Sequence, residues 1–585
     1  MPQPKLIVAS LALLSLLACS QDPSSTETSR FVATKPGSGK NDSYVNTAAK
    51  EYAFSGTAHI VAPENAESLE PDALAAELKR KADSRLRAIA QSISSQLREK
   101  VSELNNAIPH ELPQEIADSI KDEDDSTKRK ILENWRTQQE VSAFSRSNST
   151  FQDSIRKTDD GRYAFDFKLE FVLSNKLADA LFPDSGGTTG SLEVTVTDYY
   201  DPQNTEKLSV NAAPTPSTDS FPKYKEMFED GVFDVAIHVG GDYNSDEVKI
   251  CCPGENGETT CETKTCTNSC ANDENACTKE PPAGCTKELI IGRIDRYTAE
   301  HLVATLKADG FQHEAETYKD LKIDSPPFEK IYKFDTFELL VRVKIVFPEI
   351  VPCGEEQKLV DAMKESLKTA DMIVYAGHAG PGAGFLLDYQ PRTELDDADW
   401  KNLEMPSKYQ MILMYGCETY STYADAMFAN PNKNDGNLDV VTTANTMWTN
   451  MGLPGTLTVF NGLLLQDEAS KKHIPVSWTR LLMWLNTQEQ NAHTHYGVHG
   501  VDSDPKISPW SDPSTLCHSC ESDADCPGGG NFCITYGDGT KGCGLACTTD
   551  AACGDGYQCY QIPGTEDSLF PKICVPTSFS CTPSE

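Results

Sequence analysis

The pattern of apolar and polar side chains changes twice along the chain. Between residues 72 and 104 apolar side chains recur every three or four positions, which predicts one long amphipathic helix. Residues 163–171 and 192–196 instead alternate apolar with polar side chains, which predicts half-buried strands of an antiparallel sheet. The helix and the sheet together predict an α+β N-terminal domain over residues 51–212.

From Phe221 onward, short apolar runs alternate with amphipathic helical patterns. This alternation is typical of a mostly parallel sheet that helices cover on both faces. The sequence therefore predicts an α/β domain over residues 221–500, including a helix that Thr298 caps and that ends at Gly310. The predicted strands are residues 232–239, 289–294, 337–347, 372–376 and 411–415, and a second helix is predicted over residues 355–369.

The N-terminus has the layout of an export signal. Lys5 precedes an uncharged apolar run over residues 6–17, which is too short to span a bilayer. The run ends in Leu-Leu-Ala-Cys19, which resembles the bacterial lipobox, where the cysteine is lipidated and the chain is cut before it. We expect residues 1–18 to be a lipoprotein signal peptide and Cys19 to carry the lipid. A plain secretory signal is the alternative.

Lipid on Cys19 would be the membrane anchor, because no later segment has enough uninterrupted apolar residues to cross a bilayer. Residues 19–50 are expected to be the anchor and a flexible tether, since they are rich in small and polar side chains. Ser20 after the cysteine resembles the outer-membrane sorting pattern. We expect a protein anchored in the outer membrane, in the periplasm or at the cell surface.

Charge and cysteine usage narrow the class of protein. The formal net charge is −36, which repels phosphates and argues against nucleic acid as a partner. Of the 20 cysteines, seven lie in residues 251–285 and ten in residues 517–581. Export to an oxidising compartment predicts that these clusters form disulfides. Residues 251–285 would then be a cysteine-rich insert in the α/β domain.

Residues 512–585 are predicted to be a small disulfide-rich module, because they contain a repeat of one cysteine pattern. Zinc binding is the alternative, but the cluster lacks the paired two-residue hooks of a zinc ribbon, and its one nearby histidine is His518. In the repeat, Cys520, Asp523, Cys526 and Cys533 match Cys547, Asp550, Cys553 and Cys559.

Two predicted strands end in residues that suit nucleophilic catalysis. Gly377 and His378 follow the strand over residues 372–376, and Gly416 and Cys417 follow the strand over residues 411–415. The carboxyl ends of parallel strands converge where ligands bind, so the imidazole can face the thiol and favour the reactive thiolate. Taken singly, the alternatives are an inert core thiol and a structural histidine.

A run of three histidines, His493, His495 and His499, has a spacing that could bind a metal. The glycines and aspartates around it favour an exposed loop instead. We predict neither a metal site nor a cofactor.

An apolar strand ending in His-Ala-Gly, followed by an apolar strand ending in Gly-Cys-Glu-Thr, resembles the caspase-like superfamily of cysteine peptidases. The order of these segments after Val-Gly-Gly-Asp242 and Ile-Ile-Gly-Arg293 looks most like the gingipain-type branch. The Gly-Cys417-Glu-Thr segment also resembles the CHAT peptidase domains. The resemblance covers about residues 221–490 and implies a caspase-like α/β fold.

The resemblance also implies roles for individual residues. Cys417 would be the nucleophile and His378 the general acid and base, with the backbone near the histidine stabilising the oxyanion. Glu418 could be an acid of the substrate pocket, but its position favours a solvated carboxylate at a helix start. The family usually has glycine directly after the histidine, where this chain has alanine. The backbone and pocket residues would be Gly377, Ala379, Gly380, Gly416 and Glu418.

These observations predict a membrane-anchored, extracytoplasmic cysteine peptidase that hydrolyses proteins or peptides through a Cys417–His378 dyad. The alternatives are a catalytically inactive relative that binds peptides in the same cleft, and an adhesion lipoprotein. Cys417 is expected to be a free thiol. The ten C-terminal cysteines can pair among themselves, the seven of the insert become even with Cys353, and Cys19 is lipidated.

Overall fold

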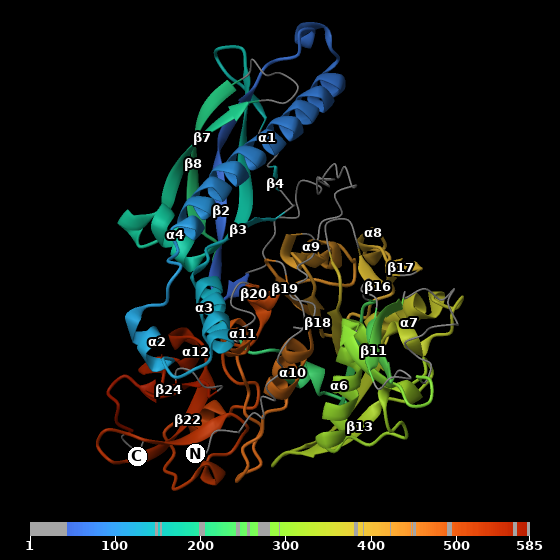
Figure 1. Ribbon diagram of the computed structural model, residues 1–585. Coiled ribbons are helices and arrows are strands. Elements are labelled where there is room, and N and C mark those ends of the chain that lie inside the picture. The colour runs from blue at the N-terminus through green and yellow to red at the C-terminus, as the bar shows by residue number, and fades with distance from the viewer. Residues whose placement is uncertain are drawn as a thin grey trace.

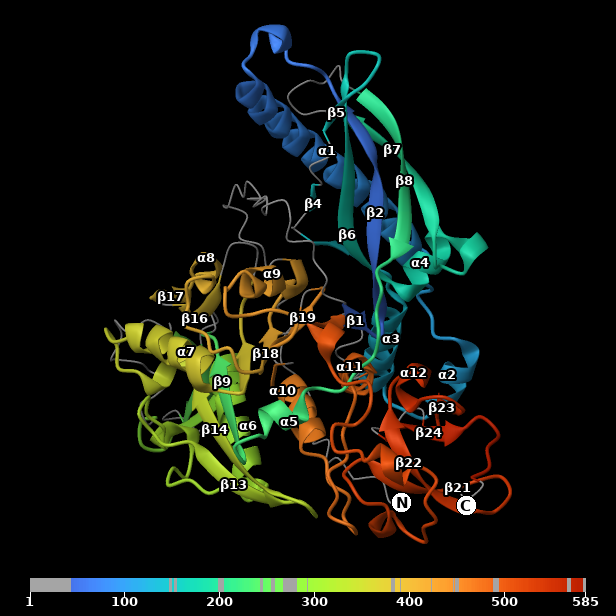
Figure 2. The same cartoon turned by 180° about the vertical axis from the view of Figure 1, so that it is seen from behind.

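The structure, a computed structural model, has a mixed α/β architecture with several sheets (Figure 1 and Figure 2). Its C-terminal region is rich in disulfides. The predicted signal peptide and Cys19 lie outside the described residues. The structure describes residues 44–146, 150–151, 155–197, 205–241, 246–253, 258–266, 281–291, 293–379, 384–389, 391–421, 423–445, 447, 452–487, 494–565 and 570–581.

The N-terminal part is an antiparallel sheet with one long helix lying along it (Figure 1). The helix α1 (Pro71–Asn106) buries its apolar stripe, including Leu86, Ile89 and Ile93, in the same core as Phe54 and Phe167 of the sheet. The predicted helix and strands are therefore confirmed. The sheet has the order β3-β6-β2-β8-β7, with β2 Ala49–Ile60, β3 Ala143–Ser145, β6 Tyr163–Ser174, β7 Gly190–Thr197 and β8 Thr205–Pro214.

Eight strands form the central sheet, in the order β1-β20-β19-β18-β15-β9-β14-β13. The five strands from β19 to β14 run parallel, and the outer three are antiparallel to their neighbours. The prediction of a mostly parallel sheet is confirmed. The bounds are β1 Val45–Asn46, β9 Val232–Val239, β13 Phe328–Lys333, β14 Glu338–Val346, β15 Met372–Ala376, β18 Gln410–Tyr415, β19 Leu438–Thr443 and β20 Tyr496–His499.

Helices cover both faces of the central sheet, as predicted. One face contacts α6, α10 and α11, and the other contacts α7 and α9 (Figure 2). Buried parallel strands read as continuous apolar runs because both of their faces are covered, and every residue of β15 and β18 is buried. The bounds are α6 Ile294–Ala308, α7 Gln357–Thr369, α9 Tyr423–Phe428, α10 Gly452–Leu463 and α11 Trp478–Thr487.

One predicted strand joins a different sheet. The run predicted over residues 289–294 ends β12 (Thr286–Ile291), which pairs antiparallel with β10 (Asp246–Pro253) of the insert. The pairing is local: β10 also pairs with β11 (Thr259–Cys266), and disulfides link Cys251 to Cys261 and Cys252 to Cys285. The helix that follows begins at Ile294, so Thr298 lies inside the helix and the predicted cap is wrong.

Two predictions about exposed segments are also wrong. The tether was predicted to reach residue 50, but β1 already pairs with β20 of the central sheet. Tyr44 is buried there, with its ring 5.0 Å from that of Tyr420 and 4.7 Å from that of His499. The histidine run was predicted to be an exposed loop. His495 and His499 are instead buried, and His499 is the last residue of β20. His493 lies outside the described residues.

The C-terminal module contains a four-stranded sheet, and its repeat is visible in the disulfides. The strand order is β21-β22-β24-β23, with β21 Asn531–Thr535, β22 Lys541–Cys547, β23 Tyr557–Tyr560 and β24 Lys572–Pro576. In each copy the first cysteine pairs with the third, Cys520 with Cys533 and Cys547 with Cys559. The matching aspartates accept a hydrogen bond from the amide of that third cysteine, at 2.7 Å for Asp523 and 2.8 Å for Asp550. The disulfides Cys526–Cys543, Cys553–Cys574 and Cys517–Cys581 complete the module.

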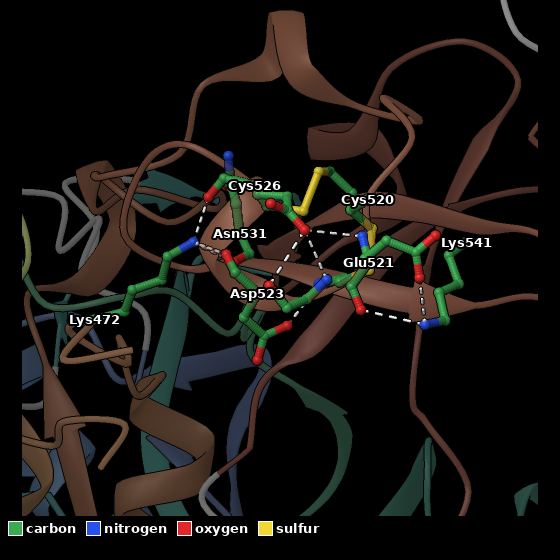
Figure 3. The surroundings of a disulfide bond; sticks show 11 residues. Lys472, Cys520, Glu521, Asp523, Cys526, Asn531 and Lys541 are labelled. Carbon is green, nitrogen blue, oxygen red and sulfur yellow. Dashed lines mark hydrogen bonds and ion pairs between the residues drawn. A yellow bond between two sulfur atoms is a disulfide. The ribbon is translucent and has the colours of Figure 1, made fainter. Parts of the chain in front are cut away.

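These pairings confirm the predicted disulfides and exclude the zinc alternative for this cluster, because sulfurs in disulfides do not bind zinc as thiolates. The module shares its apolar core with the α/β domain, and Lys472 adds polar contacts between them. Its ammonium donates to main-chain oxygens of Asp523, Cys526 and Asn531 (Figure 3). None of the described helices has the length and apolar composition of a membrane span.

Candidate functional site

The strand order locates the edge of the sheet where a ligand would bind. Among the five parallel strands, β9 comes first in the chain. The next strand, β14, lies on one side of β9, and the later strands β15, β18 and β19 lie in that order on its other side. In such sheets the connections change direction beside the first strand, and ligands bind in the crevice outside the carboxyl ends there. Gly240 follows β9 and Gly377 follows β15 at this edge, and Gly240 N–H donates to Ala376 O at 2.9 Å.

The predicted catalytic pair lies at this edge, on adjacent parallel strands. Ala376 of β15 is in register with Tyr415 of β18. Gly377 N–H continues the ladder by donating to Tyr415 O at 3.0 Å. His378 lies two residues beyond Ala376, and Cys417 lies two residues beyond Tyr415. The two strands therefore place both residues at the same end of the sheet. The prediction that their strands are neighbours is confirmed.

The main chain of His378 is fixed by a hydroxyl from its own strand. Tyr375 Oη lies 2.5 Å from His378 O and 3.0 Å from Leu386 O, and it accepts the Leu386 N–H at 3.0 Å. Leu386 belongs to β16 (Phe385–Tyr389), which forms a hairpin with β17 (Arg392–Leu395). His378 as a whole residue is half-buried.

Cys417 is 6% exposed, and its Sγ lies 3.7 Å from Met447 O. The sulfur is in a disulfide, as is every cysteine of the described residues, so the prediction of a free thiol is wrong. The prediction assumed that Cys19 is lipidated and that Cys353 pairs with a cysteine of the insert, so that Cys417 would have no partner. Parity cannot identify partners, and a disulfide sulfur is not a nucleophile in this state.

The residues after Cys417 have an unusual backbone. Glu418 has φ 54°, a left-handed conformation that costs energy for a side chain of this size. Its N–H donates to Asn445 O at 3.1 Å. Burial raises the pKa of the Glu418 carboxyl above its ordinary value. Glu418 is half-buried and directly precedes the 3₁₀ turn Thr419–Ser421. Both of its expected roles, a substrate-pocket acid and a solvated carboxylate at a helix start, stay predictions.

Threonine hydroxyls hold the same segment against the sheet. Thr419 Oγ1 donates to Met414 O at 3.0 Å and accepts from Thr443 N–H at 2.9 Å. Thr443 Oγ1 donates to Gly416 O. The backbone around Cys417 is thus fixed by hydrogen bonds that do not involve the sulfur.

The predicted oxyanion residues form a close contact between the two loops. A Cβ on Gly416 would lie 2.4 Å from the Ala379 Cβ and 3.0 Å from Gly377 O, so position 416 needs glycine. Ala379 is not among the residues with positive φ, and its departure from the family glycine requires no strained backbone. Gly380 lies outside the described residues.

The sequence reasoning missed Tyr375, whose hydroxyl orients the histidine loop. The available signal was a single polar group in the otherwise apolar run of β15. It also missed Arg146 and Glu51 of the N-terminal part, which reach Tyr420 and Asp425 beyond Cys417. No local pattern marks those residues, because their partners are distant in sequence.

A groove of about 510 Å³ lies elsewhere, between the beginning of β9 and helix α7. Asp234, Arg342, Lys344 and Ser366 are among its lining residues. None of the predicted site residues lines it, so it is separate from the His378–Cys417 edge.

Comparison with known proteins adds no relative to this description. No family model, no curated protein and no solved structure matches the chain.

Proposed function

We propose that the edge carrying His378 and Cys417 is the active site of a cysteine peptidase that is latent while Cys417 is in a disulfide. The observation that carries the proposal is the register of β15 and β18, which places His378 and Cys417 at equivalent positions just beyond the ends of adjacent strands. The edge is also where the strand order directs a ligand.

Activation requires a dithiol reductant. One of its thiolates attacks the sulfur bonded to Cys417, so that Cys417 leaves as a thiolate and a mixed disulfide forms. The second thiol of the reductant then attacks this mixed disulfide, which releases the partner cysteine as a thiol and leaves the reductant as a disulfide. In turnover His378 would take the proton from Cys417 and the thiolate would attack the peptide carbonyl. His378 then protonates the leaving amine, and water hydrolyses the thioester.

The caspase-like resemblance supports this assignment from a different direction. The family's segments occur in their expected order in the sequence. Three of them, at Gly240, His378 and Cys417, follow strands of the mostly parallel sheet, whereas the segment ending at Arg293 follows β12 of the insert sheet. The main-chain N–H of Ala379 would stabilise the oxyanion, because the N–H of Gly377 already donates to Tyr415 O. The substrate would be a protein or peptide.

The enzyme would work outside the cytoplasm. The lipobox-like sequence around Cys19 supports a lipid anchor in the outer membrane, and the disulfides of the insert and the C-terminal module suit an oxidising compartment.

The disulfide of Cys417 favours a second candidate, a catalytically inactive protein that binds peptides at the same edge. In that case the disulfide would be permanent and structural, like those of the C-terminal module.

The test compares the full chain before and after mild reduction with a dithiol. Mass spectrometry first identifies a reductant concentration that opens the Cys417 disulfide and leaves Cys520–Cys533 intact. The proposal expects iodoacetamide to label Cys417 below the ordinary thiol pKa of about 8.5 and a peptide library to be cleaved. Cys417→Ala and His378→Ala should each abolish cleavage, and the double variant should be little worse.

His301→Ala is the matched control, because it removes another half-buried histidine, on α6, away from the edge. It should leave cleavage unchanged. A reduced and labelled Cys417 with no cleavage of any library peptide would contradict the peptidase and leave the binding protein. Cleavage that survives Cys417→Ala would place the activity elsewhere.

A further inference from the structure

Side chains of the N-terminal part reach the segment that begins at Cys417. Arg146 follows β3, and its guanidinium donates to Asp425 Oδ1 at 2.9 Å and to Glu51 Oε1 at 3.1 Å. Tyr420 Oη donates to the same Glu51 oxygen at 2.7 Å. We call Glu51, Arg146, Glu170, Tyr420 and Asp425 the Arg146 junction.

The junction is largely buried, and it brings three carboxyl groups close to one guanidinium. Side-chain exposure is 0% for Arg146, 2% for Glu51, 6% for Glu170 and 9% for Asp425. Lys168 adds a second cation 3.0 Å from Glu170. Removing one partner from such a buried cluster leaves charges without compensation, so each contact strongly constrains the geometry of the others.

The Arg146 junction contacts the Cys417 segment at two points. Tyr420 lies in the 3₁₀ turn Thr419–Ser421, directly after Cys417 and Glu418, and its ring centroid is 5.6 Å from the Arg146 guanidinium carbon. Asp425 lies in α9, the next helix. One arginine therefore contacts the turn and the helix through which the chain leaves the strand edge.

We propose that Arg146 is a positioning residue for Cys417, and that the N-terminal part is a permanent component of the site rather than a detachable propiece. Arg146 holds Tyr420 and Asp425, and these hold the turn that sets the direction of the Cys417 side chain. The catalytic consequence rests on the proposed peptidase function, whereas the positioning itself does not.

Hydrogen exchange of the full chain tests the positioning directly. The variant Arg146→Gln should speed amide exchange over residues 416–428 by roughly 10- to 100-fold, because it breaks a buried ion-pair cluster. Arg85→Gln is the matched control. Arg85 is also a fully buried arginine of the N-terminal part, but it pairs with Glu206 at 3.1 Å, far from the junction. It should leave exchange over residues 416–428 unchanged.

Two further variants keep the test decisive if Arg146→Gln fails to fold. Asp425→Asn removes the same contact from the α/β side, and Arg146→Lys keeps the charge but loses the planar fork. Asp425→Asn should reproduce faster exchange over residues 416–428, and Arg146→Lys should be intermediate. Unchanged exchange in Asp425→Asn, or equal acceleration in Arg85→Gln, would overturn the proposal.

Peptide turnover after reduction gives the second readout. Loss of positioning should lower kcat in Arg146→Gln with little change in KM, since the orientation of the sulfur matters in the transition state. If the wild-type chain cleaves no peptide, the peptidase proposal fails, while the exchange result still decides whether Arg146 positions the segment. A KM effect with kcat unchanged would contradict the positioning role.

Discussion

Replacing Glu51 by glutamine should remove a pH dependence of the folding free energy that arises in the Arg146 junction. Glu51 accepts hydrogen bonds from Tyr420 at 2.7 Å, Thr215 at 2.9 Å and Arg146 at 3.1 Å. Burial, followed by repulsion from the Glu170 carboxylate, nevertheless raises the pKa of Glu51 to about 8. Glutamine keeps the shape of the protonated acid and carries no charge at any pH.

The sign of the effect follows from proton binding. Between its ordinary pKa of 4.5 and about 8, the Glu51 carboxyl holds its proton in the folded chain and loses it in the unfolded chain. The folded state binds more protons, so stability is greatest below the ordinary pKa and falls as pH rises through this window. Between about pH 5 and about pH 8, the loss is on the order of 3 kcal/mol. The Glu51→Gln chain should lack it.

Hydrogen-exchange protection along the β2–β6 ladder is the appropriate assay, since a chain of several parts has no single unfolding free energy. The protection free energy of wild type minus that of Glu51→Gln should become more negative from about pH 5 to about pH 8. Tyr420→Phe removes a hydrogen bond that lowers the pKa of Glu51, so it should extend the wild-type trend to higher pH. A difference that stays constant across the range would refute the reasoning.

Three other perturbations have definite expected outcomes. Cys19→Ser should release the protein from the membrane fraction, and continued tight association would contradict the lipid anchor. Lys472→Met should lower the free energy of unfolding of the C-terminal module by about 2–4 kcal/mol, because it removes hydrogen bonds from a charged donor. Proteolysis within the module should then be faster. Asp550→Ala should lower the free energy of unfolding of the module by about 1–2 kcal/mol and speed the reduction of Cys547–Cys559, because Asp550 accepts a hydrogen bond from the Cys559 amide. Unchanged reduction kinetics would argue against this role.

Buried strands could be located closely from the sequence. The bounds predicted for β9 and β15 agree with the structure, because strands covered on both faces are nearly continuous runs of apolar side chains. The run over residues 289–294 was misassigned for the same reason. An apolar run predicts burial, but the sheet that it joins depends on the partner, and here β10 of the insert supplies that partner.

The neighbouring positions of His378 and Cys417 were predictable because parallel strands end at a common edge. The disulfide on Cys417 was not, since cysteine counting does not identify partners. The Arg146 junction was equally hidden. Its members come from β2, β6, the residue after β3 and the segment after β18, and only the folded chain brings them together.

The Cys417 segment is held in two ways that do not depend on the disulfide. Threonine hydroxyls fix its backbone at Gly416 and Thr419, and the Arg146 junction fixes Tyr420. Opening the disulfide would therefore change the chemistry of the sulfur and leave its backbone in place. A thiol released into a preorganised backbone needs no rearrangement before reaction, whereas a segment held by the disulfide alone would lose its geometry on reduction. On this argument latency and preorganisation are separate properties, and the second depends on the N-terminal part of the chain.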